Sequence, residues 1–169
     1  DHLFFVAGLL LLVGWSMRLV YTVTAFTVGH SVTLALVSLG VVTNPEAVIE
    51  WLIALSIWVL AFELSRPGKH SRLWQRPWYL AALFGLLHGM GFAGALAETG
   101  LPQLHLPTAL LFFNVGIELG QLAFIALLTV VGTFVLRLSQ ASWIKIAPVY
   151  VLGAVSTYWL LDRTGALLG

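Results

Sequence analysis

Ionisable side chains occur in this sequence at positions where they are costly. His30, His88 and Glu118 each lie inside a long apolar segment, and the pair Asp1-His2 lies at the mouth of another. A charged group at the centre of a membrane helix costs at least about 2.5–3.5 kcal/mol. Because only 9% of the residues are charged, these placements indicate a function. We expect the groups to meet in one polar cluster inside a helix bundle, most simply a metal site.

The donor types narrow the choice of metal. Imidazole and carboxylate ligands suit Zn²⁺, Ni²⁺, Co²⁺ or Fe²⁺ better than Cu⁺ or Ca²⁺. The sequence has no cysteine, which excludes disulfides, thiolate ligands, iron–sulfur clusters and thiol catalysis. Structural roles stay open, because His30 or His88 could each cross-link two helices by one hydrogen bond. Glu118 could be a neutral carboxyl group bonded to Asn114 or to backbone.

The composition places the cluster in a membrane protein. Hydrophobic residues make up 60% of the chain, and the mean hydropathy is +0.98. A soluble domain of this size does not need so much apolar surface. The basic residues form no stripe of the kind that nucleic-acid binding requires. We therefore predict an all-α, polytopic helix bundle in a lipid bilayer, with residues 1–169 as a single transmembrane domain.

Six apolar segments separated by proline, glycine and charged residues predict six transmembrane helices. The expected helices cover residues 1–15, 21–41, 46–64, 78–97, 106–131 or beyond, and 143–161. The first is shorter than the roughly 20 residues that cross a bilayer. We expect this helix to be truncated at its N-terminus, upstream of Asp1.

Basic residues are concentrated in alternate loops. The loops after the first, third and fifth helices, with the adjoining helix ends, contain Arg18, Arg66, Lys69, Arg72, Arg76, Arg137 and Lys145. The positive-inside rule places these loops in the cytoplasm and the C-terminus outside, in a bacterial inner membrane. His30, His88 and Glu118 then lie near mid-depth, with Glu50 about one turn below the outer surface. The cluster is expected in the outer half of the bundle.

Other polar residues share the helix faces of the cluster. Thr27, His30 and Ser31 are three or four residues apart, so they lie on one side of the second helix. Asn114 and Gln121 continue the side of Glu118 on the fifth helix. We expect four residues to support the ligands: Thr27, Glu50, Asn114 and Gln121.

Glycines predict where helices approach closely. Gly85 and Gly89 form one G-x-x-x-G pattern, next to His88, and Gly116 and Gly120 form another. The pattern Phe-x-x-x-His occurs at Phe26–His30 and again at Phe84–His88, in helices expected to run in the same direction. This echo is compatible with a two-helix repeat.

Several of these segments together resemble the HupE/UreJ family, in particular its poorly characterised HupE/UreJ-like branch. The segments are Asp1–Val6, Phe26–Leu34, Val48–Ser56, Phe84–Ala93 and Phe113–Gln121. Better-known members of the family resemble nickel permeases that serve hydrogenase or urease maturation. Their first-helix motif ends in Asp-His, which would correspond to Asp1-His2. Their fourth-helix motif carries several His and a Glu, of which this chain has His88.

The resemblance implies a permease for a divalent transition metal, with Ni²⁺ or Zn²⁺ as the bound ion. The implied metal ligands are Asp1, His2, His30, His88 and Glu118. One alternative is an intramembrane zinc metallohydrolase acting on a lipid or membrane peptide, with Glu118, Glu50 and Ser31 as catalytic groups. Another is an accessory subunit of a larger membrane complex, in which the cluster is structural. Whether the protein is an enzyme, and whether it forms a homo-oligomer, stay open.

Overall fold

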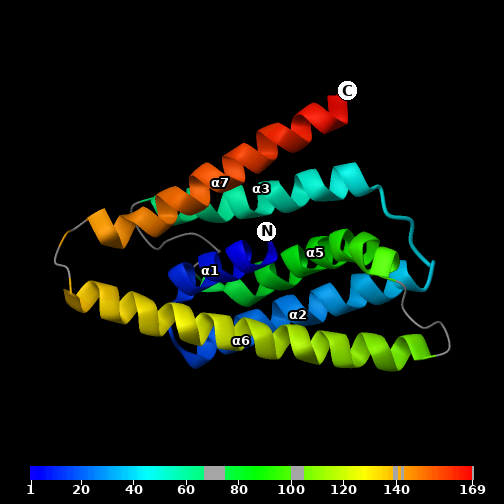
Figure 1. Ribbon diagram of the computed structural model, residues 1–169, viewed down its shortest axis with the longest axis horizontal. Helices are drawn as coiled ribbons and strands as arrows, with labels where there is room; N and C mark the ends of the chain where they lie inside the picture. The colour runs from blue at the N-terminus through cyan, green and yellow to red at the C-terminus, as the bar shows by residue number, and fades with distance from the viewer. Residues whose placement is uncertain (67–74, 100–104, 139–140, 142, 169) are drawn as a thin grey trace.

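The computed structural model of the protein describes residues 1–66, 75–99, 105–138, 141 and 143–168. Within these residues the fold is all-α (Figure 1). The helices are α1 (His2–Val13), α2 (Met17–Ser38), α3 (Glu46–Ser65), α5 (Pro77–Thr99), α6 (Leu106–Leu138) and α7 (Trp143–Leu168). Four of them, α2, α3, α6 and α7, are long and apolar enough to cross a membrane, and α1 is a shorter apolar helix. The predicted all-α bundle of six helices is confirmed.

The helix ends differ from the expected ones mainly at the last helix. The sequence Asp162-Arg163-Thr164 suggested an end at residue 161, but α7 continues to Leu168. The extra turns are held by side-chain contacts. Arg163 and Thr164 both form hydrogen bonds with residues of α3. These two polar residues therefore face the neighbouring helix, and α7 does not end at them. Helix α6 reaches Leu138, in agreement with the expected extension beyond residue 131.

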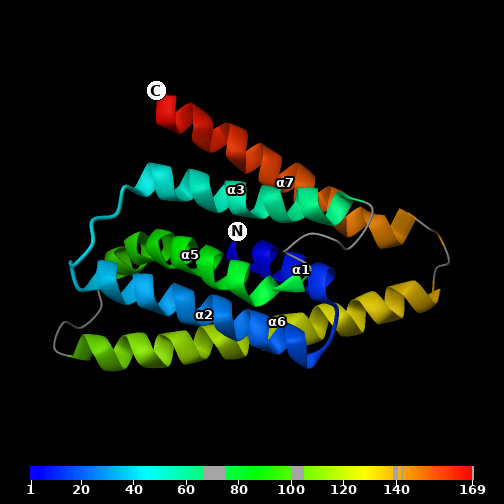
Figure 2. The same ribbon diagram turned by 180° about the vertical axis from the view of Figure 1, so that it is seen from behind.

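The helices alternate in direction along the long axis of the molecule. Figures 1 and 2 show α2, α5 and α7 running one way and α1, α3 and α6 the other. The basic residues near helix ends therefore gather at one end of the bundle: Arg18, Arg66, Arg76, Arg137 and Lys145. Lys69 and Arg72 lie outside the described residues. This common end agrees with the predicted alternation of the loops, while the assignment of that end to the cytoplasm stays a prediction.

Helices α2 and α5 pack backbone against backbone. A Cβ atom on Gly85 would collide with the carbonyl oxygen of Phe26, and one on Gly89 with that of His30. A Cβ on Gly29 would strike Ala82 from the other side. The Gly85–Gly89 pattern therefore forms the close helix contact that its spacing predicted, and this contact brings the helices of His30 and His88 together.

The second glycine pattern faces open space. In the described part of the chain, nothing lies within 4 Å of a Cβ built on Gly116 or Gly120. Large apolar side chains of the same helix, among them Leu111, Phe112 and Leu119, are also exposed. In a bilayer this side of α6 contacts lipid or another protein.

The two patterns give a matched test of stability. Gly89→Ala should lower the free energy of unfolding by about 1–3 kcal/mol, because the new methyl group overpacks a helix contact. Gly120→Ala should leave it unchanged or raise it by up to about 1 kcal/mol, since alanine favours the helix. Thermal or denaturant unfolding in detergent measures both. Equal effects of the two substitutions would contradict the packing described here.

Candidate metal-binding site

Three histidine rings meet in the interior of the bundle, each from a different helix. His2 begins α1, and its ring centroid lies 5.2 Å from that of His30 on α2 and 5.9 Å from that of His88 on α5. His30 and His88 are 0% and 2% exposed. Phe26 packs against all three rings, at centroid distances of 4.9 to 6.3 Å. The structure thus brings together the three histidines that the sequence singled out.

Ser56 on α3 fixes the orientation of His88. The hydroxyl of Ser56 donates to the carbonyl oxygen of Ile53 at 2.7 Å and lies 3.1 Å from Nε2 of His88. A serine has a single hydroxyl proton, so its oxygen accepts the second bond from the Nε2–H of His88. A neutral His88 ring then keeps its lone pair on Nδ1.

His30 has a different environment. Both of its ring nitrogens are buried, and neither has a hydrogen-bond partner among the residues that the structure describes. The surrounding contacts are rings: His2, Phe26 and Phe92, the last at a centroid distance of 5.9 Å. A buried polar group without a partner costs about 1–3 kcal/mol. His30 is thus maintained at a cost to the stability of the fold.

Two polar pairs lie beside the histidines, between α2 and α6. Thr27 donates to Oε1 of Gln121 at 3.0 Å, and the amide nitrogen of Gln121 contacts Nε2 of His2. Thr24 donates to Oε1 of Glu118 at 2.6 Å. Thr24 precedes His30 by six residues, about 9 Å along a helix axis. Gln121 therefore contacts the histidine cluster directly. Glu118 instead bonds to Thr24, which lies further from His30 along α2.

Asp1, just before α1, and Glu50 on α3 contact the guanidinium group of Arg163 and not the histidines. Oδ2 of Asp1 lies 3.1 Å from Nη2 of Arg163 on α7, and Oδ1 of Asp1 accepts from the backbone N–H of His2 at 2.7 Å. Oε2 of Glu50 lies 3.7 Å from Nε of Arg163. Arg163 also donates to the backbone carbonyl of Glu50 at 2.8 Å. Asp1 and Glu50 are thus adjacent to the cluster but engaged with Arg163.

The remaining candidates bond to their own helices. Ser31 donates to the carbonyl of Thr27 at 2.7 Å, and Asn114 donates to that of Leu110 at 2.8 Å. The side-chain oxygen of Asn114 is buried without a partner. Across the described part of the chain, no three His, Asp or Glu side chains are already gathered closely enough to hold a metal ion. The rings of His30 and His88 each contact that of His2, but the ring nitrogens of the three histidines are not gathered around one point.

A family profile described as "HupE / UreJ protein" matches residues 1–163 of the chain. The chain belongs to the HupE/UreJ family. Searches of curated proteins and of solved structures found no match. The match extends the resemblance in the sequence, which ended near Gln121, into α7, where Arg163 is its last residue. The HupE/UreJ match and the helices together show a multi-pass membrane protein.

Two residues of this HupE/UreJ protein were missed by reasoning from the sequence. Ser56 stood in an apolar helix, where a serine usually bonds to its own backbone, and only the fold places it against His88. Arg163 follows the last expected helix, which was predicted to end at residue 161. Its position two residues after a long apolar run, in a chain with eight basic residues, was the available signal.

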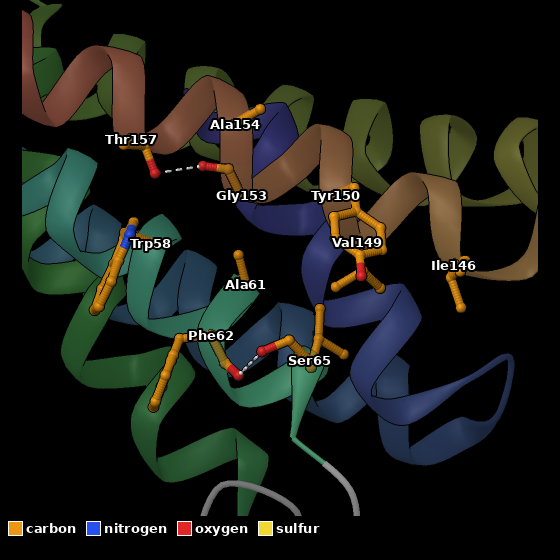
Figure 3. Close-up of a pocket in the computed structure, with 11 residues that line it drawn as sticks. Trp58, Ala61, Phe62, Ser65, Ile146, Val149, Tyr150, Gly153, Ala154 and Thr157 are labelled. Carbon is orange, nitrogen blue, oxygen red and sulfur yellow. Dashed lines mark hydrogen bonds between the residues drawn. The ribbon is translucent and has the colours of Figure 1, made fainter. Parts of the chain in front are cut away.

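A groove of about 570 Å³ lies between α3 and α7 (Figure 3), and its lining residues include none of the three histidines. Trp58, Phe62 and Ser65 line one wall, and Tyr150 and Thr157 are on the other. Its lining is mostly apolar and contains no ionisable group that binds metals. In this HupE/UreJ protein the groove is a space between two helices near the basic end of the bundle.

Proposed function

We propose that this HupE/UreJ protein is a permease for a divalent transition-metal cation of the Ni²⁺ type. The cation would bind as a substrate between His2, His30 and His88. The observation that carries the proposal is His30: among the described residues its two buried ring nitrogens have no hydrogen-bond partner, and its ring contacts that of His2, which in turn contacts His88. A bound cation would supply the missing partner. The family resemblance, with its nickel permeases, supports the same class of substrate.

The spacing of the rings suits metal binding after small rotations. Two imidazole nitrogens held at about 2.1 Å from one cation separate their ring centroids by roughly 4.5 Å at the 90° angle typical of Ni²⁺, and by roughly 5 Å at a tetrahedral angle. The centroids of His30 and His88 lie 5.2 Å and 5.9 Å from that of His2. His88 offers Nδ1, and His30 offers the unprotonated nitrogen of a neutral ring. His2 would exchange its contact with Gln121 for the cation.

We place Glu118 in a second step of transport. Its carboxylate, bonded to Thr24, lies towards the basic end of the bundle from the histidines. A cation leaving the imidazoles would meet this anionic group next, and protonation of Glu118 would release the cation. Weak, sequential ligands suit a carrier, since a substrate must leave as well as bind.

The metallohydrolase alternative has less support. A hydrolytic site needs a carboxylate placed to activate a metal-bound water. Glu118 bonds to Thr24, Glu50 contacts Arg163, and Ser31 bonds to its own helix. None of the three catalytic candidates touches the histidine cluster in this arrangement.

The test is equilibrium binding followed by transport. Purified protein should bind about one Ni²⁺ per chain, with Co²⁺ and Zn²⁺ as competitors, and proteoliposomes should take up radioactive Ni²⁺ beyond empty vesicles. Titration calorimetry and filtration assays measure the two quantities. If none of the three cations binds saturably, the proposal is refuted. One tightly held ion that does not exchange would favour an enzymatic or structural role.

A further inference from the structure

Arg163 joins three helices at one point next to His2. It emerges from α7 and reaches Asp1 on α1 and Glu50 on α3, with a bond to the Glu50 backbone at 2.8 Å. The side chain of Arg163 is 18% exposed, compared with 31% for Asp1 and 47% for Glu50. The guanidinium therefore lies on the inner side of both carboxylates. Trp159 packs beneath it, at 5.9 Å from ring centroid to guanidinium carbon.

Two polar bonds join the last part of α7 to α3. Beside Arg163, the side chain of Thr164 accepts a hydrogen bond from Trp51 of α3 at 2.9 Å. Further towards the basic end, the groove separates parts of α3 and α7, from Trp58 and Thr157 to Ser65 and Ile146 (Figure 3). Release of Arg163 would thus remove the polar bond between α7 and Asp1, the residue before His2.

We propose that Arg163 is a gating and selectivity residue, which closes the approach to the histidines until a divalent cation displaces it from Asp1 and Glu50. This inference rests on the proposed metal site. Arg163 offsets only one of the two negative charges of Asp1 and Glu50, and a monovalent cation that replaced it would do no more. A divalent cation carries the charge needed to compete for both carboxylates. Backbone and carboxylate bonds to a planar guanidinium hold the closed state in a defined geometry.

The natural absence of cysteine allows a direct test of the closed state. Ile53 is 4% exposed and lies on α3 between Glu50 and Ser56, one turn from each. In the full chain in detergent, without metal, Ile53→Cys should react slowly with a cationic methanethiosulfonate reagent. Arg163→Gln should raise that rate about tenfold or more. Arg163→Lys should give an intermediate rate, because lysine keeps the positive charge but lacks the planar guanidinium group that bonds to two partners at once.

Two control positions separate gating from loosening of the bundle. Leu60→Cys, 1% exposed on the same helix, should stay unreactive in both backgrounds, and Thr43→Cys, in an exposed segment, should react rapidly in both. An unchanged rate at Ile53, or equal acceleration at Ile53 and Leu60, would overturn the inference.

Metal affinity tests the competition with the guanidinium. Arg163→Gln should bind Ni²⁺ about tenfold more tightly than the wild type, because the carboxylates no longer have an internal cation. An unchanged affinity would overturn the selectivity role. If neither protein binds Ni²⁺ while Ile53 is still protected by Arg163, the proposed function fails and the gate itself stands.

Discussion

Replacing His30 by leucine is expected to abolish Ni²⁺ binding and, at the same time, to stabilise the metal-free protein. The imidazole is 0% exposed, and neither ring nitrogen has a hydrogen-bond partner. An apolar side chain of similar volume removes that unsatisfied group, and the free energy of unfolding should rise by about 1–3 kcal/mol. Uptake should fall by about 100-fold or more, because even groups that only orient a metal ligand contribute 10- to 100-fold to affinity.

Thermal unfolding in detergent and vesicle uptake measure the two effects on one preparation. The matched control is His105→Leu, since His105 is exposed at the start of α6 and should affect neither quantity. A His30→Leu protein that transports normally would remove His30 from the site. One that is strongly destabilised would mean that the ring has a partner, such as water, that keeps it in place.

The second large effect is expected for Glu118→Gln. Glutamine can still accept the hydrogen bond from Thr24, at 2.6 Å in the native protein, so the fold should be preserved. It cannot ionise, so a cation leaving the histidines finds no anionic group. We expect Ni²⁺ affinity to change less than about threefold and uptake to fall at least tenfold, consistent with the usual size of a general acid–base contribution.

Calorimetry and uptake across an imposed pH gradient separate binding from transport. The wild type should respond to the gradient, and Glu118→Gln should not. Glu46→Gln serves as control, because this glutamate is exposed in the first turn of α3, away from the cluster. Loss of binding and uptake in equal proportion would identify Glu118 as a direct ligand instead.

Much of the fold followed from the sequence because membrane helices leave a strong local signal. Runs of about 20 apolar residues indicated the helices, and the cost of burying imidazoles in such runs singled out His30 and His88. The glycines beside His88 predicted the close helix contact that joins them. These inferences depend on residues near one another in the chain.

Long-range pairs could not be found in this way. Arg163 and Asp1 are 162 positions apart, and nothing in either segment indicates the other. The two G-x-x-x-G patterns are equally good in the sequence, yet only Gly85–Gly89 has a partner helix among the described residues. Which pattern is used depends on how the helices are arranged, and local spacing does not contain that information.

The glycine contact between α2 and α5 has a consequence for transport. Helices whose backbones touch cannot slide or separate without losing the whole contact, so α2 and α5 should move as one body. His30 and His88 would then keep a constant separation through every stage of a transport cycle. The third histidine belongs to α1, a helix of 12 residues whose buried side chains pack in the main core of the bundle. The fixed pair would select cations by radius, and release of the selected ion would require His2 to move away from the pair, because the pair itself cannot open.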